Sequence, residues 1–223
     1  MQIKAVYFDY DGLLFDTEKI YCKYWVAASQ DLGYDLREED ALLLRSCDSK
    51  LAAVTIKEKL GLSVDYSAIK ARRKELMEQY YRDHEIELKT GATELVSYLA
   101  TQKHLRIAVV TSSRGEEKKK ILEEHGLLQY FTDIVSADSV SRGKPFPDVY
   151  NYACQSLGVE PAQCVAFEDS PNGVRSAVAA GVQVVMIPDL TEPTPELSSM
   201  ATVLRSLEEG KALMERFFSD ETQ

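Results

Sequence analysis

The chain has 223 residues, enough to bury a large hydrophobic core in one domain or in a core domain with a smaller insertion. Its 36 acidic and 26 basic residues give a formal net charge of −10, which argues against nucleic acid or an anionic membrane surface as the main partner. A small anionic substrate is compatible with this charge, because a few local cations or a metal ion can reverse its sign within one pocket.

The first residues, MQIKAVYFDYDG, run directly into an expected strand and lack the charged leader, apolar segment and cleavage site of a secretory signal. The longest apolar stretch, SAVAAGVQVVMI, is too short to span a bilayer. The four cysteines are scattered without paired spacing, which favours reduced thiols over disulfides or a zinc site. We therefore expect a cytoplasmic protein with no membrane partner and no structural zinc.

Short β-branched runs alternate with helical patterns through the last two-thirds of the chain. The expected strands are residues 4–9, 105–113, 133–137, 164–170 and 183–189, and the expected helices are 115–131 (closed by Gly126), 148–159 and 172–182. Repeated strand–helix order predicts an α/β fold, a Rossmann-like parallel sheet of at least five strands with helices on both faces.

Between about Glu18 and Glu87 the periodicity is helical throughout, with no convincing strand. A helical block that interrupts an α/β domain after its first strand is typical of an inserted subdomain. We expect residues 17–87 to form an all-helical cap domain and residues 1–16 and 88–223 to form the core domain. Such a cap would pack over the carboxyl ends of the strands, where open α/β sheets bind ligands.

Carboxylates follow the first expected strand in the segment VYFDYDGLLFDTE. Asp9 and Asp11 are two residues apart, so in an extended chain their side chains emerge on the same side. An Asp-Gly turn that leaves a buried strand, with Asp16 capping the next helix, explains the same residues at least as well. This segment alone therefore decides little.

A group of hydroxyl side chains follows the next expected strand. Thr111, Ser112 and Ser113 precede Arg114 at the start of an expected helix. Hydroxyls and free backbone N–H groups at a helix N-terminus are suited to bind phosphate, although hydroxyls also commonly cap helices.

Two more polar clusters complete the set. Lys144 lies between prolines in GKPFPD, and Glu168 and Asp169 end the strand in VAFEDSPNGV. Each cluster alone could be an exposed lysine or a strand-to-helix turn. All four clusters nevertheless fall on the same edge of the expected sheet, and their carboxylates, hydroxyls and lysine together fit magnesium plus phosphate.

The motifs FDYDG, VVTSS, GKPFPD and FEDSPNGV resemble, in order and spacing, the four motifs of the haloacid dehalogenase superfamily. The sequence is most similar to the branch that includes β-phosphoglucomutase and the small sugar- or nucleotide-phosphate phosphatases. DGLLFDTE resembles the turn and flap that lead into the helical cap of that branch. The resemblance covers essentially the whole core, and the cap matches in its helical character and position only.

The resemblance implies a role for each core motif. Asp9 would be the nucleophile that forms an aspartyl-phosphate, and Asp11 the general acid for the leaving alcohol and then the general base for water. Thr111 would bind the phosphoryl oxygens, and Lys144 would stabilise charge beside the nucleophile. The implied Mg²⁺ ligands are Asp9, the backbone carbonyl of Asp11, and Asp169, with support from Glu168. The expected substrate-binding residues are Gly12, Tyr21, Arg45, Lys50, Ser112, Ser113 and Arg114.

The acceptor of the phosphoryl group is either water or a sugar phosphate. Mutases of this branch carry a histidine four residues after the Asp-Thr of the flap, and Tyr21 stands in that place here. Arg45 and Lys50 are not cleanly aligned with the arginine of the mutase cap loop. We therefore expect a phosphatase of a sugar phosphate or nucleoside monophosphate, with a mutase and a non-catalytic phosphometabolite-binding regulator as alternatives. A monomer suffices, because one chain can complete the site.

Overall fold

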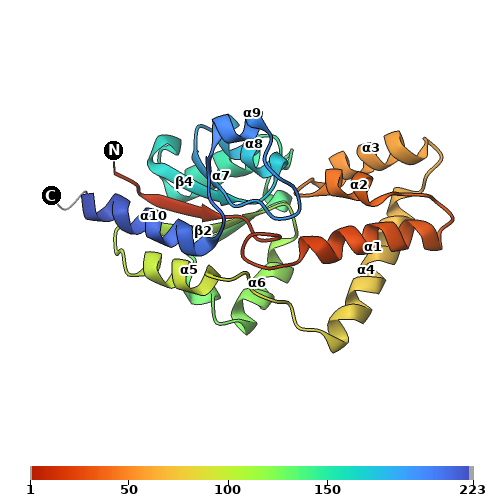
Figure 1. Ribbon diagram of the computed structural model, residues 1–223, viewed down its shortest axis with the longest axis horizontal. Helices are drawn as coiled ribbons and strands as arrows, with labels where there is room; N and C mark the ends of the chain where they lie inside the picture. Colours follow the sequence, from red (N-terminus) through yellow and green to blue (C-terminus); the bar gives the residue numbers. More distant parts are fainter. Residues whose placement is uncertain (1, 221–223) are drawn as a thin grey trace.

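The computed structural model describes residues 2–220 and contains a parallel six-stranded sheet of order β3-β2-β1-β4-β5-β6 (Figure 1). The strands are β1 (Ala5–Phe8), β2 (Arg106–Thr111), β3 (Asp133–Ser136), β4 (Cys164–Glu168), β5 (Gln183–Met186) and β6 (Thr202–Val203). Every residue of the two central strands, β1 and β4, is buried. Strands that are buried on both faces appear in the sequence as continuous apolar runs, which is why AVYF and CVAF could be predicted to form strands.

Helices cover both faces of this sheet. The helices of this part are α5 (Ala92–Ala100), α6 (Gly115–Glu124), α7 (Asp148–Leu157), α8 (Pro171–Ala179), α9 (Pro195–Met200) and α10 (Leu207–Asp220). Val6 and Phe8 of β1 belong to an apolar layer with α5, α6 and α10, whereas Ala5 and Tyr7 pack with α7, α8 and α9. The two-residue period of a strand thus divides its side chains between two separate layers.

The helical block after β1 lies to one side of the sheet (Figure 1). It consists of α1 (Glu18–Asp31), α2 (Glu38–Ala41), the 3₁₀ turn Leu42–Leu44, α3 (Ser49–Leu60) and α4 (Tyr66–Asp83). Residues 17–87 contain no strand, and Trp25, Ile56 and Ile69 lie in an apolar cluster of their own. A separate core supports the division into a cap and a core domain, which we retain as a proposal.

Two short chain segments join this helical block to the sheet. Phe15 and Leu88 form an isolated antiparallel bridge. Beside it, the N–H of Asp16 donates to the carbonyl of Glu87 at 2.9 Å. The entry to α1 and the exit from α4 are therefore paired with each other, directly beyond the carboxyl end of β1.

The expected α/β fold is confirmed, and the differences concern short or irregular elements. In the segment 115–131, the helix expected to be closed by Gly126 is α6, which ends before this left-handed glycine, and a 3₁₀ turn at Leu128–Tyr130 follows it. Within the helical block, α2 is followed directly by the 3₁₀ turn Leu42–Leu44. Four elements were not predicted from the sequence: α5, α9, α10 and β6. Strand β6 has only two residues, too few to show the alternation of apolar and polar side chains that is typical of a strand.

The cap core offers a test of packing. Ile56 is fully buried in the cap cluster, whereas Val54 on the same helix is 51% exposed. We expect Ile56→Ala to lower the free energy of unfolding by about 2–5 kcal/mol, because it leaves a cavity. Val54→Ala is expected to change it by about 0.5 kcal/mol or less. Denaturant unfolding of both variants measures this, and equal losses would contradict the assigned cap core.

Candidate active site

Three buried carboxylates meet at the carboxyl ends of the central strands. Asp9 follows β1, Glu168 ends β4, and Asp169 comes directly after it. One oxygen from each of the three lies within 4.8 Å of the others, and none of the three residues is more than 1% exposed. The parallel sheet brings them together, because the carboxyl ends of adjacent parallel strands share one edge.

A buried lysine lies among these carboxylates. Lys144 Nζ is 2.6 Å from Asp9 Oδ1 and 2.7 Å from Glu168 Oε1, and it donates to the carbonyl of Val110 at 2.9 Å. Tyr150 of α7 donates its hydroxyl to the same Glu168 oxygen. The residue expected from sequence to be a cation near Asp9 is therefore a fully buried ammonium with three acceptors.

The other carboxylate oxygens have no hydrogen-bond partner among residues 2–220. They are Asp9 Oδ2, Glu168 Oε2 and both oxygens of Asp169. Burial raises the pKa of Glu168 to about 7 although Lys144 opposes the shift, and burial also holds the pKa of Asp9 and of Asp169 above its usual range. Unpaired carboxylate oxygens are the ligands that Mg²⁺ prefers, so these residues fit that ion.

Two glycines allow these carboxylates to approach the backbone. A Cβ on Gly173 of α8 would lie 1.8 Å from Glu168 Oε2. Gly12 has a φ of +84°, and a Cβ there would lie 2.5 Å from Asp169 Oδ2. A side chain at either position would displace a carboxylate, which gives Gly12 a structural role next to the site.

Asp11 lies beside this cluster but is held differently. Its Oδ1 accepts from Thr17 Oγ1 at 2.7 Å and from Lys118 Nζ at 2.6 Å, and its Oδ2 accepts from Ser113 Oγ at 2.9 Å. Burial lowers the pKa of Lys118, but Asp11 and Tyr21 more than offset this and hold it above its usual value. The Asp11 carboxylate is thus fixed by three donors, and the metal contact of its carbonyl stays a prediction.

The hydroxyl cluster after β2 is split between the site and the cap. Thr111 Oγ1 accepts from the N–H of Ser113 at 3.1 Å, whereas Ser112 donates to the carbonyl of Ser46 in the cap at 2.7 Å. Arg114 is exposed and immediately precedes α6. Thr111 and Ser113 are therefore beside the carboxylates, while Ser112 joins the two parts of the chain.

The three cap residues expected to contact substrate differ in their surroundings. The hydroxyl of Tyr21 lies 3.5 Å from Lys118 Nζ, close to Asp11. Arg45 is buried and donates to Thr191 Oγ1 at 2.7 Å. Lys50 is exposed and donates to the carbonyl of Ser141 at 3.0 Å. Tyr21 is thus linked to Asp11 through Lys118, Arg45 is buried against Thr191, and Lys50 is exposed, and all three substrate roles stay predictions.

Sequence reasoning missed Lys118, Tyr150 and the position of Glu18. Lys118 is the first of three consecutive lysines in an amphipathic helix. It lies four residues before Leu122, on the buried face of that helix, and this spacing is the only sequence feature that distinguishes it from the two exposed lysines after it. Tyr150 belongs to the buried apolar face of α7. Its position in the helical pattern predicts burial but does not show that its hydroxyl contacts a carboxylate. Glu18 starts α1 as expected, but it is buried next to Gly12.

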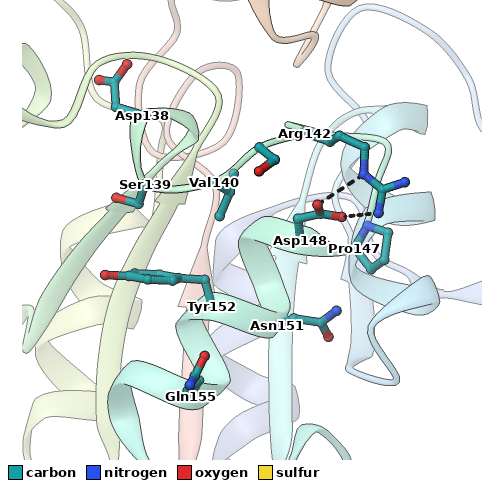
Figure 2. A pocket seen from close by; sticks show the side chains of 10 residues that line it. Asp138, Ser139, Val140, Arg142, Pro147, Asp148, Asn151, Tyr152 and Gln155 are labelled. Atoms are coloured by element: carbon teal, nitrogen blue, oxygen red, sulfur yellow. Dashed lines mark hydrogen bonds and ion pairs between the residues drawn. The ribbon is translucent and has the colours of Figure 1, made fainter.

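A surface hollow of about 550 Å³ lies elsewhere, along α7 and the loop before it (Figure 2). In Figure 2, Arg142 and Asp148 are paired, and Tyr152 and Gln155 of α7 also line the hollow. None of the three clustered carboxylates lines it. The carboxylate cluster, and not this open hollow, is where the chemistry-bearing groups converge.

Comparison with known proteins is in keeping with this site. A phosphorylated carbohydrates phosphatase of Thermotoga maritima is 27% identical over 213 residues, or 96% of this chain and 91% of the relative. A β-phosphoglucomutase of Bacillus subtilis is 30% identical over 193 residues, 82% of each chain. The crystal structure of CbbY from Rhodobacter sphaeroides with xylulose-(1,5)-bisphosphate aligns with a TM-score of 0.77 at 26% identity, covering 93% of this chain and 96% of that one.

Within residues 2–220 no helix is long and apolar enough to cross a bilayer.

The family model of haloacid dehalogenase-like hydrolases matches residues 6–187, which include all four strand-end clusters. Because this match spans well over half of the sequence, the chain belongs to the haloacid dehalogenase-like hydrolase family.

Proposed function

We propose that the protein is a Mg²⁺-dependent phosphatase of small phosphorylated metabolites, such as a sugar phosphate or a nucleoside monophosphate. One observation carries the proposal: the Lys144 ammonium is buried between Asp9 and Glu168, beside carboxylate oxygens that have no partner. A site of this charge can receive a dication and a phosphoryl group together. We also propose that the protein is cytoplasmic and complete as a monomer.

Asp9 is the proposed nucleophile. One of its carboxylate oxygens, Oδ1, accepts from Lys144, and the other, Oδ2, has no hydrogen-bond partner in the part of the chain that the structure describes. A bond from Asp9 to phosphorus would form as the ester bond to the leaving alcohol breaks, giving an aspartyl-phosphate. Carboxylate and phosphate repel each other, and Lys144 reduces that repulsion at the attacking group.

Asp11 is the proposed general acid and base. It would give a proton to the leaving alcohol and later take one from the water that hydrolyses the aspartyl-phosphate. The donors Thr17, Ser113 and Lys118 fix its position two residues from the nucleophile. Release of this carboxyl group from part of that network would let it reach the substrate oxygen.

Asp9, Glu168 and Asp169 are the proposed metal ligands. Their free oxygens converge, and Gly12 and Gly173 leave room for two of the carboxylates. Bound Mg²⁺ would supply positive charge that neutralises the phosphoryl oxygens during transfer. Within the described residues, the Asp169 carboxylate has neither a hydrogen bond nor an ion pair, so it is the carboxylate most dependent on such a cation.

A phosphomutase is the second candidate. The match to a β-phosphoglucomutase favours it, but Tyr21 occupies the place of the mutase histidine. A mutase must also protect the aspartyl-phosphate from water while a bisphosphate intermediate turns over. A coupled assay for conversion of β-glucose 1-phosphate into glucose 6-phosphate distinguishes the two, and we expect phosphate release without that conversion.

The proposed function is tested by a panel of phosphorylated metabolites together with p-nitrophenyl phosphate. We expect Mg²⁺ to support release of inorganic phosphate and a chelator to reduce it to background, because the carboxylate cluster repels the substrate without a cation. Undiminished release in chelator would contradict the metal requirement. No release from any phosphomonoester would contradict the phosphatase.

Substitutions of Asp11 and Asp169 should impair catalysis in different ways. We expect Asp11→Asn to lower kcat by about 10²- to 10⁴-fold with little change in the Mg²⁺ concentration for half-maximal rate, since proton transfer is lost. Asp169→Ala should instead raise that concentration. Mg²⁺ titrations of both variants measure this, with the exposed Asp35→Asn as control. Rescue of Asp11→Asn by added Mg²⁺, with no rescue of Asp169→Ala, would reverse the two roles.

A further inference from the structure

Two of the four cysteines lie side by side on one face of the sheet. All four thiols are free in this structure. Cys154 on α7 and Cys164, the first residue of β4, have their sulfur atoms 4.0 Å apart. Cys22 lies on α1 and Cys47 follows the 3₁₀ turn of the cap, so both belong to the helical block. The spacing of cysteines in the sequence gives no sign of this contact, because it depends on how α7 packs against β4.

The two sulfur atoms have different hydrogen-bonding surroundings. Tyr7 of β1 donates its hydroxyl to Cys154 Sγ at 3.5 Å. Cys164 Sγ lies 3.6 Å from the hydroxyl oxygen of Tyr7 and 3.3 Å from the carbonyl oxygen of Glu160, and its thiol is a donor toward both. Hydrogen bonds to a sulfur favour its thiolate, whereas hydrogen bonds from a thiol favour the protonated form. The surroundings therefore favour a thiolate at Cys154 and a thiol at Cys164.

The acidities of the four cysteines follow the same division. The hydrogen bond from Cys164 lowers the pKa of Cys154 to about 7, although burial opposes this shift. The same hydrogen bond, together with burial, holds the pKa of Cys164 well above its usual range. Burial raises the pKa of Cys22 and of Cys47 to about 12. Because the thiolate is the reactive form of cysteine, Cys154 is the sulfur that reacts first with an electrophilic oxidant.

Burial limits which oxidant can reach this pair. Cys154 is 4% exposed and Cys164 is fully buried. A reagent as small as hydrogen peroxide suits so narrow an access, whereas a bulky disulfide does not. A cysteine of low pKa beside a second cysteine that can resolve its oxidised form is the arrangement found in cysteines that respond to peroxide.

We propose that Cys154 and Cys164 form a site that hydrogen peroxide oxidises to a reversible intramolecular disulfide. The Cys154 thiolate attacks one peroxide oxygen, so an S–O bond forms, the O–O bond breaks, and hydroxide leaves and is protonated to water. The sulfur of Cys164 then attacks the sulfenic sulfur of Cys154. The S–S bond forms as the S–O bond breaks, and the oxygen leaves with the Cys164 proton as a second water.

The reaction is balanced and reversible. The two thiols together lose two electrons, and peroxide is reduced to two waters. A dithiol such as dithiothreitol returns both electrons and restores the thiols. The inference concerns the chemistry of this pair and does not depend on the proposed phosphatase function.

The disulfide would cross-link two elements that also hold part of the carboxylate cluster. Tyr150 of α7 donates to Glu168 of β4, and the cysteine pair joins the same helix and strand at a second point. Bond formation brings the sulfurs from 4.0 Å to about 2 Å apart, so α7 and β4 must approach each other locally.

Peptide mapping of the wild-type protein tests this inference. The folded protein is treated with hydrogen peroxide, then with catalase, and is unfolded, alkylated with N-ethylmaleimide and digested with trypsin. Cys154 and Cys164 lie together in the tryptic peptide 143–175, whereas Cys22 and Cys47 lie in two other peptides. We expect peptide 143–175 to lose two hydrogens and to escape alkylation, and dithiothreitol to reverse both changes. Cys22 and Cys47 are internal controls and should remain fully alkylated.

Single variants assign the two steps. In Cys164→Ser, we expect oxidation to stop at a sulfenic acid on Cys154, which dimedone labels, because the resolving thiol is absent. In Cys154→Ser, we expect Cys164 to stay a thiol under the same treatment. Cys47→Ser is the matched control and should form the disulfide as the wild type does. Circular dichroism before treatment confirms that each variant is folded.

Four results would overturn the inference. They are two alkylated thiols in peptide 143–175 after peroxide treatment, a disulfide that joins two copies of the chain, dimedone labelling of Cys164 in Cys154→Ser, and oxidation of Cys22 or Cys47 to the same extent as the pair. The first result would show that the pair does not react. The others would show that the reaction does not follow the proposed route.

Discussion

The ammonium of Lys144, buried between two carboxylates, is the interaction on which the site depends. Burying a charge without a partner is very costly, so Lys144 and the carboxylates of Asp9 and Glu168 must be placed together. One ammonium does not neutralise all the carboxylates at this place, however. Three carboxylates with Asp169 against one ammonium leave two negative charges when all are ionised, and a dication balances them. Burial raises the pKa of all three carboxyl groups, and repulsion from neighbouring carboxylates adds to that rise.

The fold provides this arrangement by simple means. Central strands β1 and β4 end side by side, so Asp9 and Glu168 are neighbours although they are far apart in sequence. The helical block enters directly after β1 and returns at the Phe15–Leu88 bridge, which places α1 and α4 beside the same sheet edge. In the proposed function, phosphoryl transfer takes place at these strand ends, and the cap beside them would contact the leaving group.

The core fold and the positions of the proposed catalytic groups could be predicted because each signal is local in the sequence. The β-branched runs predict the strands, and the helical patterns between them predict a parallel sheet. Polar residues directly after the strands then place Asp9, Thr111 and the Glu168–Asp169 pair at one edge of that sheet, with Lys144 in a loop at the same edge. Lys118 could not be found this way, since its ion pair with Asp11 depends on the angle at which α6 packs. Which lysine or arginine of an amphipathic helix turns inward is decided by tertiary contacts.

In the proposed mechanism, Asp9 carries the phosphoryl group during turnover. Borohydride reduces an acyl phosphate to an alcohol and would convert Asp9 into homoserine. Wild-type protein quenched during turnover with Mg²⁺ and substrate, reduced and digested with trypsin, should yield homoserine at position 9 in the peptide that starts at Ala5, and none when substrate is omitted. Homoserine at position 11, or unmodified Asp9 during active phosphate release, would contradict the account.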